Sequence, residues 1–119
     1  MTINEAILYA DQTKPNAYSE QQKTRWLAEL DGKIEREVFK TKELAEYTYP
    51  QDAETELLVK FPHSDIYPLY ISAMIDFHNR EFGEYNNSIL MFNQAYDVFA
   101  KWYIRNNIPK HSGGFTNII

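Results

Sequence analysis

A seam of apolar and aromatic residues in the last third of the chain constrains the fold more than any other feature. Its members follow one another at spacings of four and three, namely Tyr85, Ile89, Phe92, Tyr96, Phe99 and Tyr103. Such spacing places side chains along one side of an α-helix, as in a heptad repeat. Four further apolar residues widen the seam: Met91, Ala95, Val98 and Trp102. The pattern therefore predicts a long helix over residues 86–106.

Two capping boxes predict two helices in the first third of the chain. Thr2 and Glu5 form the first box, before a helix over residues 3–12. Ser19 begins the second box, before an amphipathic helix of about twenty residues. Gly32 lies within this helix and is interpreted as a bend or a close approach by another helix. The polar side is predicted to face solvent and comprises Lys23, Glu29, Lys33, Glu35, Arg36 and Glu37.

A further helix is predicted to begin at a cap on Ser64 or Asp65 and to end at Gly83. It is apolar around most of its circumference, which is typical of a central helix with several neighbours. Its two predicted stripes are Ile66, Leu69, Tyr70, Ala73 and Phe77, and beside them Tyr67, Ile71, Met74, Ile75 and Phe82. The short turn at Gly83 predicts that this helix and the next one pair antiparallel.

Two segments interrupt the helical pattern. Residues 39–63 form a long connection with a turn near Pro50 and a short extended run over residues 56–59. Residues 107–119 are predicted to be a flexible tail, because proline and glycine break regular structure. The expected fold is all-α, a four-helix bundle-like single domain over residues 1–106 with this middle loop and tail.

Composition excludes several classes of protein. The 119 residues suffice for one domain, and the absence of cysteine excludes disulfides and thiol chemistry. The net charge of −5, without a basic cluster, argues against specific nucleic-acid binding and against docking on an anionic membrane. No signal peptide and no run of about eighteen apolar residues is present, so a soluble, cytoplasmic protein is expected.

Catalytic, cofactor-binding and metal-ligating patterns are missing from the sequence. There is no phosphate-binding glycine motif and no zinc-binding histidine pair. His78 and Glu81 are three residues apart. A di-iron bundle uses the opposite order, Glu-x-x-His, on two helices. This chain has neither that order nor a second helix that supplies a partner. Asp76 and Glu81, with Arg80 between them, are interpreted as a surface salt-bridge group. We therefore expect no enzyme activity, no cofactor and no metal.

Aromatic content points instead to protein partners. Rings make up 15% of the residues, more than one small core needs, and aromatic side chains are enriched at protein interfaces. Trp102 is expected to lie on an outward face and to bind a partner. Three apolar residues of the predicted tail are assigned the same role: Phe115, Ile118 and Ile119. A tail with such residues can add to a neighbour's sheet edge or fill a groove.

A set of packing and capping residues resembles the small head–tail connector proteins of tailed bacteriophages and prophages. The resemblance covers residues 3–106. It rests on Trp26-Leu27-x-x-Leu30-Asp31, then Glu56-Leu57-Leu58-Val59 before Pro62, then Tyr67, then Asp76 with Glu81 and Tyr85-Asn86-Asn87-Ser88, then Phe92-Asn93 through Trp102.

The resemblance implies a structural subunit of the virion that is present in the host cytoplasm during assembly. Such subunits form a closed ring of about twelve copies below the portal protein. The ring extends the channel through which DNA passes and joins the next tail component. The family has no catalytic residues to transfer to this chain. The alternative is a small non-enzymatic helical adaptor or regulatory protein of a bacterial host.

Overall fold

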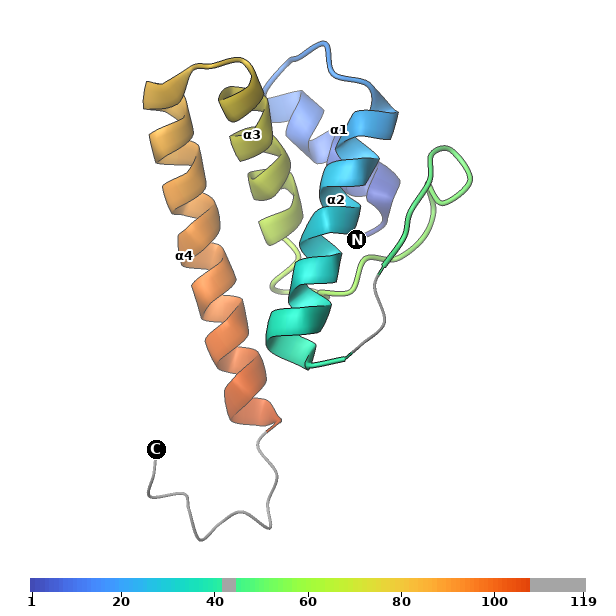
Figure 1. The fold of residues 1–119 in the computed structure, drawn as a ribbon, viewed down its shortest axis with the longest axis vertical. Coiled ribbons are helices and arrows are strands. Elements are labelled where there is room, and N and C mark those ends of the chain that lie inside the picture. The colour runs from blue at the N-terminus through green and yellow to red at the C-terminus, as the bar shows by residue number, and fades with distance from the viewer. Residues whose placement is uncertain (42–44, 108–119) are drawn as a thin grey trace, which may run out of the picture.

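The computed structural model describes residues 1–41 and 45–107, and over these residues the chain forms four α-helices and one π-helical turn. The helices are α1 (Ile3–Thr13), α2 (Glu20–Ile34), α3 (Ile66–His78) and α4 (Phe82–Asn106), and the turn η1 (Glu35–Phe39) continues α2 (Figure 1). The same residues contain no strand, only an isolated bridge between Thr2 and Glu56. The all-α prediction is confirmed.

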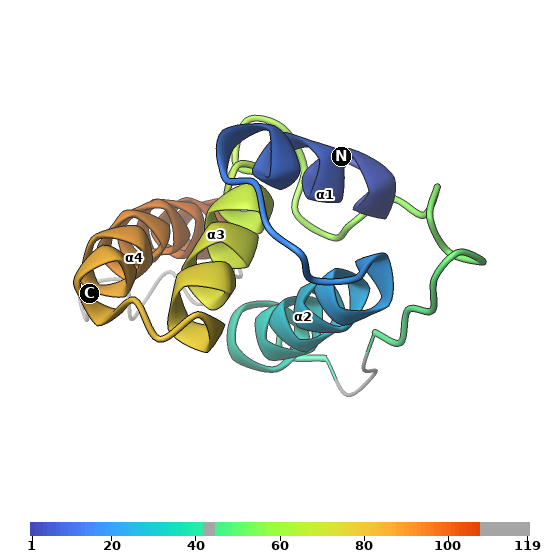
Figure 2. The ribbon, with the colours of Figure 1, turned by 90° about the horizontal axis from the view of Figure 1, so that it is seen from above.

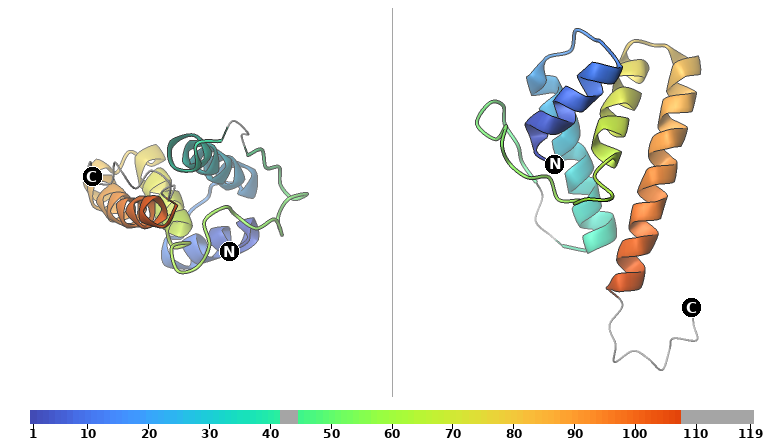
Figure 3. Two further views of the ribbon diagram at one scale, coloured as in Figure 1. Left: turned by 90° about the horizontal axis from the view of Figure 1, so that it is seen from below. Right: turned by 180° about the vertical axis from the view of Figure 1, so that it is seen from behind.

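Helix α3 lies between the other helices. It contacts α1, α2 and α4, and Figures 2 and 3 show α1 and α2 on one side of it and α4 on the other. Helix α4 runs antiparallel to α3, as the short connection predicts (Figure 1). Among the described elements, α3 and η1 approach the backbone of α4 closely, and from α2 the Lys33 Nζ atom lies 5.8 Å from the centroid of the Tyr96 ring. The long helix therefore has neighbours along one side only.

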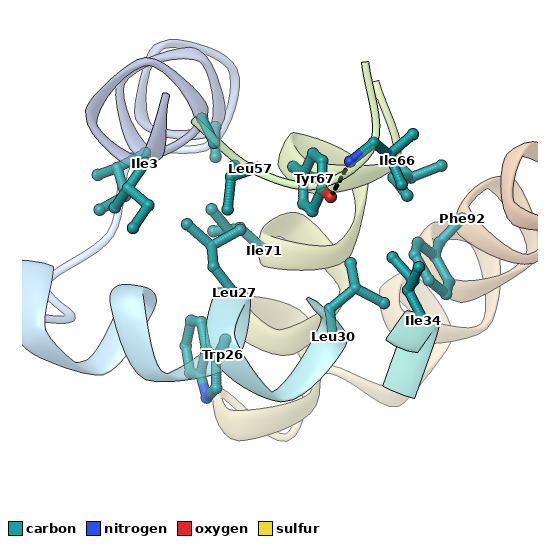
Figure 4. Close-up of a cluster of buried hydrophobic side chains, with 14 of the residues drawn as sticks. Ile3, Trp26, Leu27, Leu30, Ile34, Leu57, Ile66, Tyr67, Ile71 and Phe92 are labelled. Atoms are coloured by element: carbon teal, nitrogen blue, oxygen red, sulfur yellow. Dashed lines mark hydrogen bonds between the residues drawn. The ribbon is translucent and has the colours of Figure 1, made fainter. Parts of the chain in front are cut away.

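The apolar core lies between α1, α2 and α3 and is closed by α4. Leu27 and Leu30 of α2 meet Tyr67 and Ile71 of α3, and all four side chains are buried (Figure 4). Burial of an aliphatic side chain of this size stabilises the fold by about 1.5–3 kcal/mol. The predicted seam of α4 contributes the buried Phe92 and Phe99, with partly buried rings beside them.

The capping residues predicted for the first two helices are in place. The Oγ1 atom of Thr2 accepts from the Glu5 N–H at 3.1 Å, and the Glu5 carboxylate accepts from the Thr2 N–H at 2.9 Å. At the start of α2 the Oγ atom of Ser19 accepts from the Gln22 N–H at 3.1 Å. These bonds satisfy backbone donors that have no partner within the helix.

Of the two interpretations of Gly32, the close approach by another helix is wrong. A Cβ atom at this position would meet nothing within 4 Å, so no helix approaches closely there. The helix instead widens into η1 and stops at Lys40, whose φ of 62° lies in the left-handed region. The wider turn carries Phe39 toward the end of α4, where its ring lies 4.7 Å from that of Tyr103.

The junction of α3 and α4 corrects a second prediction. Helix α3 ends at His78, not at Gly83, because the chain reverses at Arg80 with a φ of 62°. Gly83 lies inside the first turn of α4, which begins at Phe82. Phe77 and Phe82 were both predicted to belong to apolar stripes of the third helix. In the structure Phe77 is 45% exposed and Phe82 is 54% exposed.

The connecting segment, residues 45–65, takes part in the core. Leu57 and Val59 are buried, and the chain runs beside the first turn of α1. The Ile3 N–H donates to the Thr55 carbonyl at 3.1 Å, and the Asn4 N–H donates to the Ala53 carbonyl at 2.9 Å. The predicted turn near Pro50 is present, and the extended run over 56–59 forms only the bridge at Glu56.

Two ion pairs, each with one buried and one partly exposed partner, tie the helices together and correct two further predictions. Asp76 was assigned to a surface group, yet it is 1% exposed and pairs with Lys14 at 3.0 Å while accepting a hydrogen bond from Ser88. This contact joins α3 to the end of α1 and to α4. Lys23 was placed on the solvated side of α2, yet it is 2% exposed and pairs with Asp11 of α1 at 2.8 Å.

Candidate partner-binding groove

Helix α4 exposes apolar side chains along most of its length. The described residues of α4 include six exposed large apolar side chains: Phe82, Leu90, Met91, Val98, Trp102 and Ile104. Met91 and Val98 were predicted to widen the apolar seam of α4, but they are 55% and 59% exposed and do not belong to the core.

A groove with aromatic walls lies at the C-terminal end of α4. Its cavity of about 320 Å³ is bounded by η1, the connecting segment and the last turns of α4. We call it the aromatic groove, and its lining residues are Phe39, Leu58, Val59, Lys60, Phe61, His63, Phe99, Trp102, Tyr103 and Asn107. A cavity of this size, mostly apolar with a few polar groups, is typical of a site that receives one or two side chains or a small ligand.

The rings of the aromatic groove pack against one another. The centroid of His63 lies 4.8 Å from that of Trp102 and 5.8 Å from that of Phe99. Phe39 lies 6.5 Å from Phe99 in an edge-to-face arrangement. Contacts at these distances are favourable beyond the apolar area that they bury. The floor of the groove, formed by the buried Val59 and Phe99, is therefore rigid and apolar.

Phe61 stands at the rim of the aromatic groove. It is 88% exposed, the largest exposure among the described large apolar residues. Trp102, which lines the groove from α4, is 40% exposed. The Lys60 Nζ atom donates to the Leu57 carbonyl at 2.8 Å, which holds this side chain back along the connecting segment. A partly exposed Trp and Phe around an apolar floor are the side chains that dominate binding energy at protein interfaces.

A buried carboxylate anchors the segment that carries Phe61. The Oδ1 atom of Asp31 in α2 accepts from the Tyr67 hydroxyl at 2.5 Å, and its Oδ2 atom accepts from the Tyr47 hydroxyl at 2.6 Å and from the Leu58 N–H at 3.2 Å. The Tyr67 hydroxyl in turn accepts from the Val59 N–H at 2.8 Å (Figure 4). One wall of the aromatic groove is thereby fixed to the centre of the core.

Burial changes the acidity of this network. Desolvation raises the pKa of Asp31 above its ordinary value, and hydrogen bonds from Tyr47, Tyr67 and the Leu58 N–H offset part of the rise. Burial and the neighbouring Asp31 also raise the pKa values of Tyr47 and Tyr67, so both hydroxyls remain hydrogen-bond donors. Because Leu58 and Val59 are held by this network and also line the aromatic groove, the network serves to position the segment.

A second hollow lies between α1, α3 and α4. It has a volume of about 450 Å³ and is lined by Tyr9, Thr13, Asp65, Pro68, Leu69, Ser72 and Met91. Tyr9 and Met91 are exposed at its edges. The exposed side of α4 thus connects two apolar depressions, with Met91 at one and Trp102 at the other.

The predicted partner-binding residues fall into two groups. Trp102 lies in the wall of the aromatic groove, on the outward side of α4 as predicted. Phe115, Ile118 and Ile119 lie outside the described residues. Sequence reasoning missed Phe61 and His63, which it regarded only as the end of the connection. The signal that could have found them is a phenylalanine between lysine and proline directly after the alternating buried positions of Leu57 and Val59.

The described part of the chain shows no arrangement for metal binding or for crossing a membrane. No three histidine or carboxylate side chains gather there in a way that could hold a metal ion. None of its helices combines the length and the apolar character that a membrane-spanning helix requires. The groove itself offers apolar and aromatic surface, with Lys60, His63 and Tyr103 as its titratable side chains.

Comparison with known proteins gives no relative: no protein-family model, curated protein or solved structure matches this chain.

Proposed function

We propose that this chain is a head–tail connector subunit of a tailed bacteriophage. In this role, copies of the chain form a ring below the portal protein, extend the channel through which DNA passes and receive the next tail component. The resemblance of residues 3–106 to such proteins suggests the role. The one-sided packing of α4 is the structural observation that best supports it, since a ring subunit needs apolar surface for its neighbours.

The surface of α4 fits a protein interface better than a solvated face. Met91, Val98 and Trp102 share one side of the helix, while Asp97 and Lys101 pair at 3.0 Å elsewhere on it. A contiguous apolar strip on a small protein marks a site of association. The strip ends in the aromatic groove, whose walls offer pockets for side chains of a partner.

The charge of the chain fits a channel that DNA passes without binding. The chain has 17 acidic and 12 basic residues. Affinity for DNA arises mainly from lysine and arginine that replace counterions on phosphates. We therefore propose that duplex DNA binds this protein only weakly, with no detectable binding in the micromolar range at physiological salt. Fluorescence anisotropy with a labelled duplex measures this, and sub-micromolar affinity would contradict the proposal.

Assembly on a portal tests the proposed function directly. The purified chain is mixed with the portal protein encoded in the same genome, and particles are measured by mass photometry and electron microscopy. We expect a ring of this chain bound to one end of the portal. A chain that leaves the portal bare and instead forms a stable complex with one host protein would support an adaptor and sink the connector proposal.

A further inference from the structure

We propose that the aromatic groove receives residues 108–119 from a second copy of this chain, with Phe115 as the principal side chain. The inference deepens the proposed function, because the choice of a second copy rests on the proposed ring. Three features support it: the groove, the position where α4 ends and the composition of the residues that follow.

The groove begins where the described chain ends. Asn107 lines the cavity, so residues 108–119 start at its rim. Figure 1 shows the last turn of α4 projecting past the end of η1. In the proposed ring, a neighbouring copy in contact with the exposed side of α4 would bring a second aromatic groove within reach of this segment.

The length of the segment is sufficient for such an exchange. Phe115 is eight residues beyond Asn107, which corresponds to a reach of up to about 27 Å in extended conformation. The body measures 34 Å and 22 Å along its two shorter axes. An extended segment can therefore cross the contact between two adjacent bodies and place Phe115 on the second one.

The chemistry of the segment matches that of the cavity. Its apolar residues after the glycine pair are Phe115, Ile118 and Ile119, and the cavity has an apolar floor with aromatic walls. A volume of about 320 Å³ suits one phenyl ring and an aliphatic neighbour. Trp102 and Phe61 would cover the bound ring from two sides. Since donor and acceptor surfaces differ, the contact is head-to-tail and leads to a closed ring when the rotation permits.

Nuclear magnetic resonance on full-length chains tests the exchange without any portal. An isotope-labelled tail variant, Phe115→Ser with Ile118→Ser and Ile119→Ser, keeps its groove but lacks the apolar side chains that would fill another. Unlabelled natural chain is added to it. We expect concentration-dependent shifts of the amides of Phe61, His63 and Tyr103. Unlabelled tail variant serves as the matched control and should produce none of these shifts.

Two substitutions in the labelled acceptor sharpen the test. Trp102→Ala removes a wall of the groove and should weaken the association by about tenfold or more. Ile104→Ala removes an equally apolar side chain that is 54% exposed on the same helix but does not line the groove, and it should leave the affinity unchanged. Equal weakening by both variants would overturn the inference.

The remaining outcomes also decide between explanations. Shifts confined to another surface, or no shifts, would overturn the inference. If the natural chain differs from the tail variant at the groove amides even at high dilution, the segment fills the groove of its own chain and the second-copy proposal is wrong. A tail variant that still forms a ring on the portal would refute this inference and leave the proposed function standing. If the segment binds the groove of a second copy but no ring forms on the portal, this inference stands and the proposed function is wrong.

Discussion

Helices α2 and α4 carry similar apolar patterns but use them differently. α2 is 15 residues long and buries Trp26, Leu27, Leu30 and Ile34. α4 is 25 residues long, yet its fully buried residues are Phe92 and Phe99. α2 packs against both α1 and α3, whereas among the described elements the backbone of α4 is closely approached by α3 and, to a smaller extent, by η1. The comparison teaches that an apolar position on a helix is buried only where a second element covers it.

The largest expected loss of stability is at a residue of α2 that neighbouring elements cover, in contrast to an exposed residue of α4. Leu27→Ala in α2 should reduce the free energy of unfolding by about 2–5 kcal/mol, because it leaves a cavity in the core. Val98→Ala in α4 should change it by no more than about 0.5 kcal/mol, because Val98 is 59% exposed. Urea unfolding of the two variants measures both values. Similar losses would show that α4 is covered in solution, even without a partner.

A smaller effect is expected at the anchor of the connecting segment. Tyr67→Phe removes a hydroxyl that donates to Asp31 and accepts from the Val59 N–H, and leaves both buried groups with one partner fewer. The expected loss is about 1–3 kcal/mol. Because this anchor holds one wall of the aromatic groove, the amide of Leu58, which donates to Asp31, should also exchange faster with solvent. Unchanged hydrogen exchange at Leu58 would show that the wall does not depend on the Tyr67 hydroxyl.

The titration of Asp31 gives a second test of the anchor of the connecting segment. Burial raises the pKa of Asp31, so the folded state binds this proton more tightly than the unfolded state does. The stability from this group is fully present below the unfolded pKa of about 3.9 and is lost as the pH rises through the folded pKa. Asp31→Asn removes this titration. The free-energy difference between natural chain and variant should therefore be larger near pH 4 than at neutral pH, as measured by urea unfolding. A difference that grows with pH would contradict the sign.

A small effect on stability is also expected at the end of α4 that carries the aromatic groove. Trp102→Ala and Ile104→Ala both remove exposed apolar side chains of α4, and each should change the free energy of unfolding by no more than about 1 kcal/mol. Only Trp102→Ala should weaken assembly, because only Trp102 lines the groove. Thermal unfolding and mass photometry on the portal provide the two readouts. Unfolding of the Trp102→Ala variant at ambient temperature would assign Trp102 to the core and end its interface role.

Local patterns in the sequence were enough to predict much of the fold. The capping residues Thr2 and Ser19 mark the starts of α1 and α2 because a side-chain cap acts within three residues. The end of α3 could not be predicted in this way. Gly83 is a common helix stop, but the reversal occurs at Arg80, where packing of α4 against α3 outweighs the strain of a positive φ.

The candidate site was predictable only in part. Trp102 could be assigned to a surface role because the rings of the seam exceed what one core needs. Phe61 and His63 could not be joined to it, because 39 residues separate His63 from Trp102 and no local pattern reports their 4.8 Å contact. The assignments of Phe115, Ile118 and Ile119 to a partner remain predictions, since these residues lie outside the described part of the chain.

The sequence by itself determined which segments are helical and which side of each helix is apolar, because caps and periodic spacing act over one or two turns. The tertiary structure decided which apolar sides are covered. It buried Asp76, which was assigned to a surface group from the sequence, and it left Met91 and Val98 exposed. Burial depends on neighbours that are distant along the chain, and here α3 takes the central place and leaves one side of α4 without a partner.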